Sequence, residues 1–505
     1  MAVARTLMVQ GTASNAGKSL LVTALCRYFR QKGLSVAPFK ALNMALNAHV
    51  TPDGLEIARA QAVQSEACGI EPCVEMNPLL LKPESNMRSQ VILMGKPSGS
   101  RSARDLFATG LDVKGVVVDA LNTMRSRYDL VILEGAGSPA EINLRARDVA
   151  NMFSARAADA PVLLAGDIDR GGVFASFVGT LALLEPEDRA RVKGFLVNKF
   201  RGDVSLLQPG LDWLREETGV PVLGVLPHLG TLQIAEEDSL NVDARTGKRV
   251  DTEGKISVAV LRLPRISNHD EFQPFEHEPE LSLSFTDDPL VALSADLLIV
   301  PGTKSTVSDL GWLRAEGLDH VLRLRARRGL PVLGVCGGCQ MLGRSIADPD
   351  GVESSEAHTE GLGLLPLHTR FFARKNTQRV RARKRGESWL FAGLAPDLEV
   401  PGYFIHAGIT SAEGVPPLEI TGANGPSFEA NGAVSEDGSV IGTMVHGLFE
   451  HDGLRHALID ALRTRRGLGA ASGRARWDRE AEYDRLARMI HDSCDTAALD
   501  ALVLG

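Results

Sequence analysis

Short runs of apolar residues alternate along the chain with longer segments whose apolar positions repeat at helical spacing. The short runs are rich in leucine and β-branched residues and mostly free of charge. This is typical of strands buried on both faces of a parallel sheet, with helices as crossovers. In the first half the predicted strands are Thr6–Val9, Ser35–Phe39, Asp129–Leu133, Pro161–Ala165, Gly194–Val197 and Val222–Val225. The pattern predicts a doubly wound α/β domain.

A polar stretch separates this set of strands from a second one. Residues 235–255 include the acidic run Glu236-Glu237-Asp238 and are expected to form an interdomain linker. After it, strands are predicted at Ser257–Leu263, Asp296–Val300, Val332–Val335 and Val440–Val445. We therefore expect two doubly wound parallel-sheet domains, residues 1–234 and 256–455. A helical tail at 456–505 is expected to pack against the second domain.

Length and composition agree with this division. A chain of 505 residues is too long for one hydrophobic core, and 44% hydrophobic with 23% charged residues is ordinary for globular proteins. The net charge of −8 predicts no general attraction to nucleic acid or anionic membranes, and no apolar run has the length of a membrane helix. Six cysteines in so long a chain do not form a disulfide framework, which favours a reducing cytoplasm.

One basic stretch departs from the acidic average. Residues 370–385 are rich in Lys and Arg, and the central string Arg379-Val380-Arg381-Ala382-Arg383 alternates as a strand with one basic face does. The simpler interpretation is a solvated edge strand whose charges prevent aggregation between sheets. The alternative is a basic rim that attracts a polyanionic substrate.

The first candidate site is a glycine-rich loop between a predicted strand and a predicted helix, Gly11-Thr12-Ala13-Ser14-Asn15-Ala16-Gly17-Lys18-Ser19. Its glycines let backbone N–H groups converge on phosphate oxygens at a helix N-terminus, so Gly11, Thr12 and Gly17 are predicted to contact ATP. Lys18 supplies a charge for the β- and γ-phosphates, and the Ser19 hydroxyl is a ligand for Mg²⁺. Five residues rather than four separate Gly11 from Gly17, a spacing that resembles dethiobiotin synthetase and its relatives, which make acyl phosphates.

Polar side chains follow three more strands of the first domain. Glu134 ends the strand Asp129–Leu133, at the sheet edge where the phosphate loop lies, and is the predicted acidic Mg²⁺ ligand. Asp167 and Asp169 leave the next strand in the same manner, but aspartates before a glycine pair also suit a turn. Asn198 and Lys199 end a further strand. The amide of Asn198 is predicted to contact the adenine edge, and the stem of Lys199 is predicted to cover the base.

The second candidate site is the loop Gly334-Val335-Cys336-Gly337-Gly338-Cys339-Gln340. Its Cys-x-x-Cys spacing also occurs in redox pairs and in halves of zinc sites. No second Cys-x-x-Cys pair is present, which argues against structural zinc. A buried strand before Cys336 and glycines after it favour a sharp turn that exposes a nucleophilic thiol, whose thiolate the helix N-terminus stabilises. Cys336 is therefore the predicted nucleophile, with a redox pair or a structural cysteine as the alternatives.

A thiol nucleophile needs a base and a group that stabilises the oxyanion. His446 comes directly after an apolar strand, where its imidazole can lie across the sheet edge from Cys336, and His406 is the rival candidate. Pro301-Gly302-Thr303-Lys304-Ser305 ends an earlier strand. Gly302 and Thr303, with the N–H of Gly337, are the predicted oxyanion hole.

Further strings, in order along nearly the whole chain, resemble the cobyric acid synthase family, the glutamine-hydrolysing amidotransferases of cobalamin biosynthesis. Besides the phosphate loop and the Cys336 and His446 segments, the strings lie at residues 40–47, 56–62, 76–83, 138–144, 166–172 and 198–203. Only the Cys336 and His446 segments would be shared with class I glutamine amidotransferases in general. The resemblance implies a P-loop NTPase-like domain followed by a class I glutamine amidotransferase-like domain.

The resemblance also implies the reaction. It is amidation of the b, d, e and g carboxylates of adenosylcobyrinic acid a,c-diamide, each step using one glutamine and one ATP. The expected substrates are therefore glutamine, ATP and a corrinoid polycarboxylate, with Mg²⁺ as cofactor. By the same resemblance Cys336 attacks the glutamine carboxamide and His446 transfers the proton. The ammonia then reacts with a carboxyl phosphate made in the first domain.

The chain departs from related patterns at three places. Class I enzymes with a full triad carry an acid two residues after the histidine, but this chain has Leu448 there, so the resemblance implies a Cys/His dyad, with Glu450 as the nearest downstream carboxylate. The family's Tyr-Glu-Ile-His string reads Tyr403-Phe404-Ile405-His406 here, so Phe404 replaces its glutamate. Ile266–Phe272 differs from the family's Asn-Phe-Thr-Asp-Phe-Asp string.

Two other kinds of function stay open at this level. One is a related ligase, such as cobyrinic acid a,c-diamide synthase or a cell-wall amidotransferase. The other is a nucleotide-dependent scaffold whose glutaminase half has decayed. Intact Cys336 and His446 favour an active glutaminase.

Overall fold

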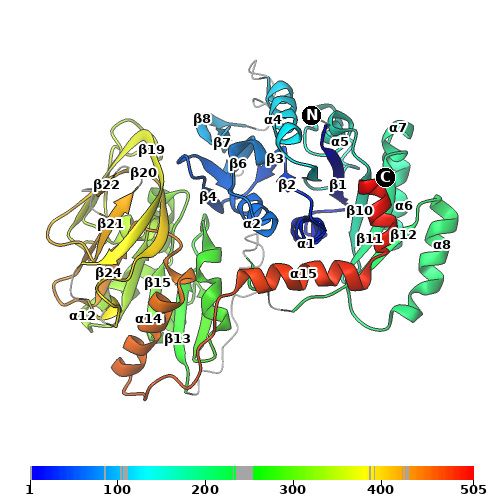
Figure 1. The fold of residues 1–505 in the computed structure, drawn as a ribbon. Helices are drawn as coiled ribbons and strands as arrows, with labels where there is room; N and C mark the ends of the chain where they lie inside the picture. Colours follow the sequence, from blue (N-terminus) through cyan, green and yellow to red (C-terminus); the bar gives the residue numbers. More distant parts are fainter. Residues whose placement is uncertain are drawn as a thin grey trace. The chain divides into compact units, whose positions relative to one another are not determined.

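The computed structural model describes residues 3–84, 87–102, 105, 112–230, 232–234, 254–385, 388–391, 393–422, 425–426 and 431–505. Within them the chain divides into two compact units (Figure 1). The first unit comprises 1–45, 57–237 and 478–505, and the second comprises 46–56 and 238–477. Most of the expected linker 235–255 lies outside the described residues.

The first unit is built on a six-stranded sheet in which every strand is parallel to its neighbours. All six strands predicted in this half belong to it. The order across the sheet is β12 (Val222–Pro227), β11 (Val192–Phe200), β10 (Val162–Asp167), β1 (Arg5–Gly11), β9 (Leu130–Glu134) and β2 (Val36–Phe39). Because β1 is central and its neighbours lead to opposite edges, the loop after it lies where the strand order reverses, which is a usual place for a ligand.

Helices cover both faces of this sheet, as the doubly wound prediction requires. On one face, apolar side chains of β1 such as Leu7 and Val9 pack with α1 (Lys18–Gln31), α2 (Arg59–Cys68), α15 (Arg479–Ser493) and α16 (Thr496–Leu504). On the other face, Met8 belongs to a core built with α4 (Val113–Arg127), α5 (Met152–Ala158), α6 (Val173–Leu183) and α8 (Gln208–Thr218). Alternate residues of one strand thus enter two separate cores.

A smaller mixed sheet in the first unit was not predicted. Its order is β3 (Leu42–Met44), β6 (Leu79–Pro83), β7 (Ser89–Leu93) and β8 (Lys96–Arg101), with β3 parallel to β6 and the other pairs antiparallel. The strands are short and partly polar, so the chain lacks the uninterrupted apolar runs that identified the main sheet.

The second unit contains another six-stranded sheet, with five parallel strands and one antiparallel edge strand. Its order is β14 (Leu281–Thr286), β13 (Ile256–Leu261), β15 (Leu297–Val300), β16 (Val332–Val335), β24 (Val440–Thr443) and the antiparallel β23 (Gly432–Val434). Its helices are α10 (Pro289–Ser294), α11 (Thr306–Ala315), α12 (Leu318–Arg327), α13 (Gly337–Leu342) and α14 (Asp452–Arg465). The α/β fold class is therefore confirmed for both halves, while β14 and β23 were not predicted.

A further sheet in the second unit contains the basic stretch and corrects one expectation. It joins β17 (Ser345–Ala347), β18 (His358–Glu360), β19 (Leu367–Lys384), β20 (Val400–Ala412), β21 (Leu418–Gly422) and β22 (Gly425–Pro426). The expected alternation is present, since Val380 and Ala382 are buried while Arg381 and Arg383 are exposed and pair with Glu399. The edge-strand interpretation is wrong, because β20 and β21 pair with the same residues of β19 from its two sides.

Residues 46–56 belong to the second unit although the sequence on both sides of them belongs to the first. They include β4 (Ala48–Val50). Three side chains of β19 bind this segment: Arg379 Nε donates to Val50 O at 2.9 Å, Thr377 Oγ1 donates to Gly54 O at 2.6 Å, and Lys375 Nζ lies 2.6 Å from Glu56 Oε2. The second unit is therefore assembled from two separate stretches of sequence.

The C-terminal tail also divides between the units. Helix α14 belongs to the second unit, as expected, but residues 478–505 belong to the first, so the expectation for this part of the tail is wrong. Figure 1 shows α15 beside α1. Arg27 of α1 forms ion pairs with Glu480 and Asp484 of α15, and Tyr483 donates to Glu66 of α2 at 2.8 Å. Polar contacts as well as the shared apolar core thus hold α15 in the first unit.

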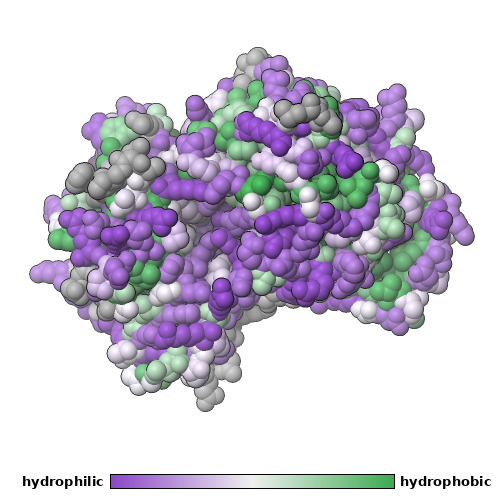
Figure 2. Space-filling model, viewed as in Figure 1, coloured by the Kyte–Doolittle hydropathy of each residue, from purple (hydrophilic) through white to green (hydrophobic). Residues whose placement is uncertain are grey.

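Hydrophilic side chains cover most of the visible surface, with an apolar area near α8 (Figure 2). Trp213 of α8 and the nearby Leu206 are exposed. Among the helices in the described part of the chain, none combines the length and the hydropathy needed to cross a membrane.

Candidate functional site

The glycine-rich loop connects β1 to α1, as predicted. Gly17 has φ +90°, a conformation that favours glycine, and a Cβ at this position would lie 2.1 Å from Asn198 Nδ2 and displace that side chain. Lys18 is the first residue of α1, and its Nζ donates to Ala13 O and Gly137 O, each at 3.1 Å. The ammonium is therefore held by backbone carbonyls of the loop itself and of the loop after β9.

Ser19 and Glu134 lie together at the carboxyl end of the sheet. Ser19 Oγ donates to Glu134 Oε1 at 2.7 Å, and Gln64 Nε2 donates to Glu134 Oε2 at 2.6 Å. Lys40 Nζ, also buried, lies 2.7 Å from Glu134 Oε1. Glu134 thus contacts both the Ser19 hydroxyl and the Lys40 ammonium group. The sequence did not predict Lys40 as a partner.

Asn198 and Lys199 both donate hydrogen bonds to backbone carbonyls of the phosphate loop. Asn198 Nδ2 donates to Ala16 O at 2.9 Å and Lys199 Nζ donates to Asn15 O at 2.7 Å. Lys199 also pairs with Asp167 at 2.9 Å. The two side chains therefore brace the loop, and their contact with adenine stays a prediction.

Asp167, the last residue of β10, and Asp169, two residues later, have structural partners. Asp169 N donates to Asp167 Oδ1 at 2.9 Å, which is turn geometry, and Asp169 pairs with Arg201 at 3.2 Å. Thr12 N donates to Ala165 O at 2.9 Å, so the loop is also joined to β10.

Cys336 lies at a sharp turn between β16 and α13. Its φ of 50° and ψ of −110° are unusual for a residue with a side chain and are typical of a nucleophile held at a strand-to-helix turn. A Cβ at Gly338 would lie 2.0 Å from Val300 O, so the turn packs against β15 too closely for any other residue. Cys339 is fully buried, and burial raises the pKa of its thiol well above the ordinary value.

The predicted oxyanion loop lies against this turn. A Cβ at Gly337 would lie 3.1 Å from Thr303 N, so the backbone at Gly337 and the loop at Thr303 are in close contact. Thr303 Oγ1 donates to Asp309 Oδ2 at 2.5 Å. Burial raises the pKa of Asp309 to about 6, although its hydrogen bonds with Thr303 and Arg265 oppose this. The loop is thus held by a side chain of α11, and its role with an oxyanion stays a prediction.

His446 follows β24 and is only 1% exposed. Its Nδ1 lies 3.0 Å from Oε1 of Glu271, which is also buried. Cys336 follows the neighbouring strand β16 and is close enough for its charge to act on the imidazole. Burial alone would lower the pKa of His446, but the charges of Glu271 and Cys336 raise it to about 10. The geometry therefore brings together the two residues predicted to catalyse glutamine hydrolysis and adds an acid to them.

His406 on β20 lies in a different environment. It is also buried, and burial lowers the pKa of its imidazole to about 4. Phe404 packs edge-on against it at 5.5 Å between ring centroids. A neutral imidazole cannot stabilise a thiolate as an imidazolium does, so the structure favours His446 over His406 as the proton-transfer partner of Cys336.

The chain matches two family models. Residues 7–242 match the CobQ/CobB/MinD/ParA nucleotide binding domain, and residues 257–454 match the CobB/CobQ-like glutamine amidotransferase domain. It is 54% identical to the cobyric acid synthase of Sorangium cellulosum (strain So ce56) and 47% identical to that of Dehalococcoides mccartyi (strain CBDB1), with 99% of every chain covered. The chain belongs to the cobyric acid synthase family. The resemblance inferred from the sequence strings is therefore confirmed, and with it the class of glutamine-dependent amide ligase and a role in amidation during cobalamin biosynthesis.

Glu271 is the residue of this site that sequence reasoning missed. It lies on the 3₁₀ helix η4 (His269–His277), in the segment that departs from the pattern of cobyric acid synthases. Counted from Asn268, however, Glu271 stands where the family's Asn-Phe-Thr-Asp-Phe-Asp string has its first acid. That substitution of one acid for another was the signal that could have identified it.

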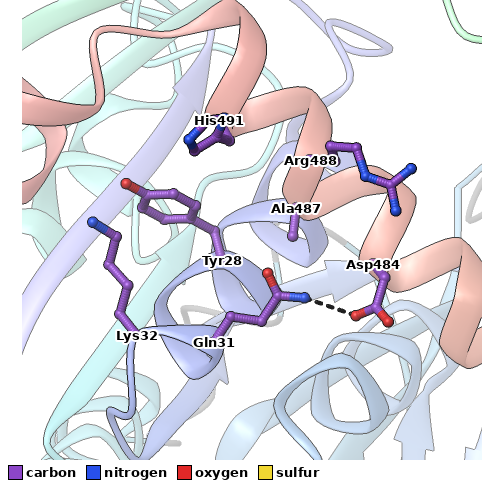
Figure 3. A pocket seen from close by; sticks show the side chains of 7 residues that line it. All are labelled: Tyr28, Gln31, Lys32, Asp484, Ala487, Arg488 and His491. Carbon is purple, nitrogen blue, oxygen red and sulfur yellow. Dashed lines mark hydrogen bonds between the residues drawn. The ribbon is translucent and has the colours of Figure 1, made fainter.

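One cavity in the first unit is lined by none of the candidate site residues. It has a volume of about 390 Å³ and lies between α1 and α15 (Figure 3). Its lining side chains come from the far end of α1 and from α15: Tyr28, Gln31, Lys32, Asp484, Ala487, Arg488 and His491. Gln31 and Asp484 bond across it at 2.8 Å. It is a depression between packed helices and contains none of the predicted site residues.

Proposed function

We propose that this chain converts adenosylcobyrinic acid a,c-diamide to adenosylcobyric acid by amidating its b, d, e and g carboxylates, with glutamine as nitrogen source and ATP as activator. The observation that carries the proposal is the buried Cys336–His446 pair at the end of a parallel strand, on a chain whose other unit carries the phosphate loop. Full-length similarity to cobyric acid synthases supports the substrate.

In the second unit, Cys336 Sγ attacks the carboxamide carbon of glutamine. The resulting oxyanion is stabilised by N–H groups of Gly337 and Thr303, with Gly302 shaping the loop. His446, protonated at neutral pH because its pKa is raised to about 10, donates a proton to the departing nitrogen, so ammonia leaves and a thioester forms. The now neutral His446 accepts a proton from water as the water oxygen attacks the thioester carbon, and the C–S bond then breaks. This releases glutamate and restores Cys336 and the protonated His446.

In the first unit, a substrate carboxylate attacks the γ-phosphorus of ATP, which gives a carboxyl phosphate and ADP. Ammonia attacks the carboxyl carbon and displaces inorganic phosphate, which leaves the amide. Gly11, Thr12 and Gly17 present backbone to the phosphates, and Lys18 neutralises charge that develops during transfer. Asn198 and Lys199 keep the loop in shape through Ala16 and Asn15 and are proposed to face the base.

The residues present fit a magnesium ion beside this loop. The Ser19 hydroxyl and the Glu134 carboxylate are oxygen donors 2.7 Å apart, and hard cations prefer such ligands together with phosphate oxygens. Mg²⁺ bound there supplies charge neutralisation for phosphoryl transfer. Lys40 pairs with the same carboxylate oxygen. When the ion is bound, Lys40 would either compete with it for Glu134 or bind a phosphate oxygen of ATP instead.

The test is a mass-spectrometric assay of purified chain with the a,c-diamide, ATP and either glutamine or ammonium chloride. We expect successive mass decreases of about 1 Da per amidation, up to four, with one glutamate and one ADP per step. A corrinoid that stays unmodified with both nitrogen sources, while cobyrinic acid or another carboxylate is amidated, would contradict the assignment of the substrate.

A further inference from the structure

Glu271 binds the catalytic histidine through both of its carboxylate oxygens. Oε1 lies 3.0 Å from His446 Nδ1, and Oε2 accepts a hydrogen bond from Gly447 N at 3.2 Å. A carboxylate at Nδ1 fixes the ring orientation and leaves Nε2 for the thiol. Leu448, two residues after His446, is buried and apolar, so the position that bears the acid in full-triad class I enzymes cannot serve here.

The segment that carries Glu271 is fixed at both ends. Before η4, Ser267 N donates to Gly302 O at 2.9 Å, and Asn268 Oδ1 accepts from Ala48 N at 2.9 Å. After η4, Glu278 binds the fully buried Arg455 of α14 at 2.6 Å. The backbone of the segment that carries Glu271 is therefore fixed by contacts that do not involve His446, as a pre-organised partner requires.

We propose that Glu271 is the third member of the glutaminase triad, a positioning residue that orients the His446 imidazole and keeps it protonated, contributed from η4 instead of from the position after the histidine. This rests on the proposed role of Cys336 and His446 in glutamine hydrolysis. The interpretation of a Cys/His dyad without an acid is replaced by Cys336–His446–Glu271.

The charges around His446 fit this role. Cys336 faces it from the start of α13 and Glu271 from η4, and both favour the imidazolium. From β20, Tyr403 stacks on the ring at 5.5 Å between centroids. His406 lies on the same strand, and burial together with the charge of His446 lowers its pKa to about 4, so it is neutral. Glu271 is thus the carboxylate whose removal should lower the pKa of His446.

The experiment compares native chain, Glu271→Gln, Glu271→Asp and the control Glu450→Gln, all as full-length protein. We expect Glu271→Gln to lower kcat for glutamine hydrolysis by about 10- to 10²-fold with KM nearly unchanged, because an acid–base group that is present but misaligned loses part of its 10²–10⁴-fold contribution. Glu271→Asp should recover part of the rate, and Glu450→Gln should stay near native.

A second readout follows the histidine itself. Alkylation of Cys336 by iodoacetamide speeds up when the imidazolium loses its proton, so the upper inflection of the rate against pH reports the pKa of His446. It should lie near pH 10 in native chain and at least about one unit lower in Glu271→Gln, since loss of a neighbouring negative charge favours the neutral ring.

Each outcome separates the possibilities. Native kcat and an unchanged inflection in Glu271→Gln would overturn the proposal, and so would a loss of kcat with the inflection unchanged, which would make Glu271 structural. Retention of ammonia-dependent amidation in the variant shows that the chain is folded. Native chain without any glutaminase would contradict the proposed function instead.

Discussion

The phosphate loop and the cysteine turn occupy equivalent places in two similar sheets, each directly after a central parallel strand, yet they are completed differently. Around the phosphate loop, Ser19 belongs to the loop's own helix, Glu134 ends the neighbouring strand β9, and Asn198 lies near the end of β11, two strands away in the same sheet. Around Cys336, the histidine comes from after β24 and its acid from a 3₁₀ helix outside the sheet. Phosphate binding uses backbone N–H groups that one contiguous loop provides, whereas proton transfer needs two side chains oriented by distant segments.

The largest effect is expected for Cys336, whose loss should abolish the use of glutamine and spare the use of ammonia. Cys336→Ala is expected to lower glutamine-dependent amidation by about 10⁴-fold or more, since removal of a nucleophile leaves only binding and oxyanion stabilisation. Amidation from high concentrations of ammonium chloride should stay near native, because the first unit is untouched. Both rates are measured by corrinoid mass spectrometry, and parallel loss of the two would make Cys336 a structural residue.

Lys18→Ala tests the phosphate loop of the first unit. It should lower amidation by about 10²- to 10³-fold with either nitrogen source, the usual cost of losing a charge that stabilises a transition state. Glutaminase should persist at a basal rate. ADP release, measured with each nitrogen source, checks this, and normal amidation by the variant would remove the first unit's phosphate loop from the mechanism.

His446→Asn and His406→Asn form a matched pair of buried histidines with opposite pKa shifts. The first should lower the glutaminase rate by about 10²-fold or more. The second should cost much less, since His406 is neutral and not bonded to Glu271. Glutamate release decides between them, and the reverse order of effects would assign the role of base to His406.

The smallest effect is expected at the second cysteine of the turn. Cys339→Ser should keep most glutamine-dependent activity under reducing conditions, because this thiol is fully buried and its raised pKa keeps it protonated. Activity is compared at equal folded concentration. A loss as large as that of Cys336→Ala would favour the redox or metal interpretation of the Cys-x-x-Cys spacing.

The difference between the two sites also decides what the sequence could predict. The strand before Gly11, the helix after it and the strand-end position of Glu134 are local signals, and all were predicted with small errors in their bounds. The Cys336 turn was predictable for the same reason. By contrast, the contact of Glu271 with His446 joins residues far apart in sequence, and a single acid in a polar segment carries no periodic signal.

Other differences have the same cause. The basic strand was identified by its alternation, but whether it lies at an edge depends on β20 and β21, which follow later in the chain. The helical character of residues 479–493 was predicted, whereas their place on α1 depends on an apolar core shared with α1 and on ion pairs such as Arg27–Asp484. The spacing of apolar residues indicates whether a segment is a helix or a strand, whereas contacts with segments distant in sequence determine where it packs.

The excursion of residues 46–56 has a consequence for how this protein can be divided or recombined. A gene cut within codons 235–255 would yield two polypeptides, and the one with the cysteine would lack β4 and the Ala48 N–H that binds Asn268, next to the helix of Glu271. The carbonyls that receive Arg379 and Thr377 would be lost with it. The second unit is thus encoded in two separate parts of the gene, one of them inside the region that encodes the nucleotide-binding unit. An exchange of the C-terminal half alone between relatives would therefore leave out residues 46–56 of the donor's glutaminase unit.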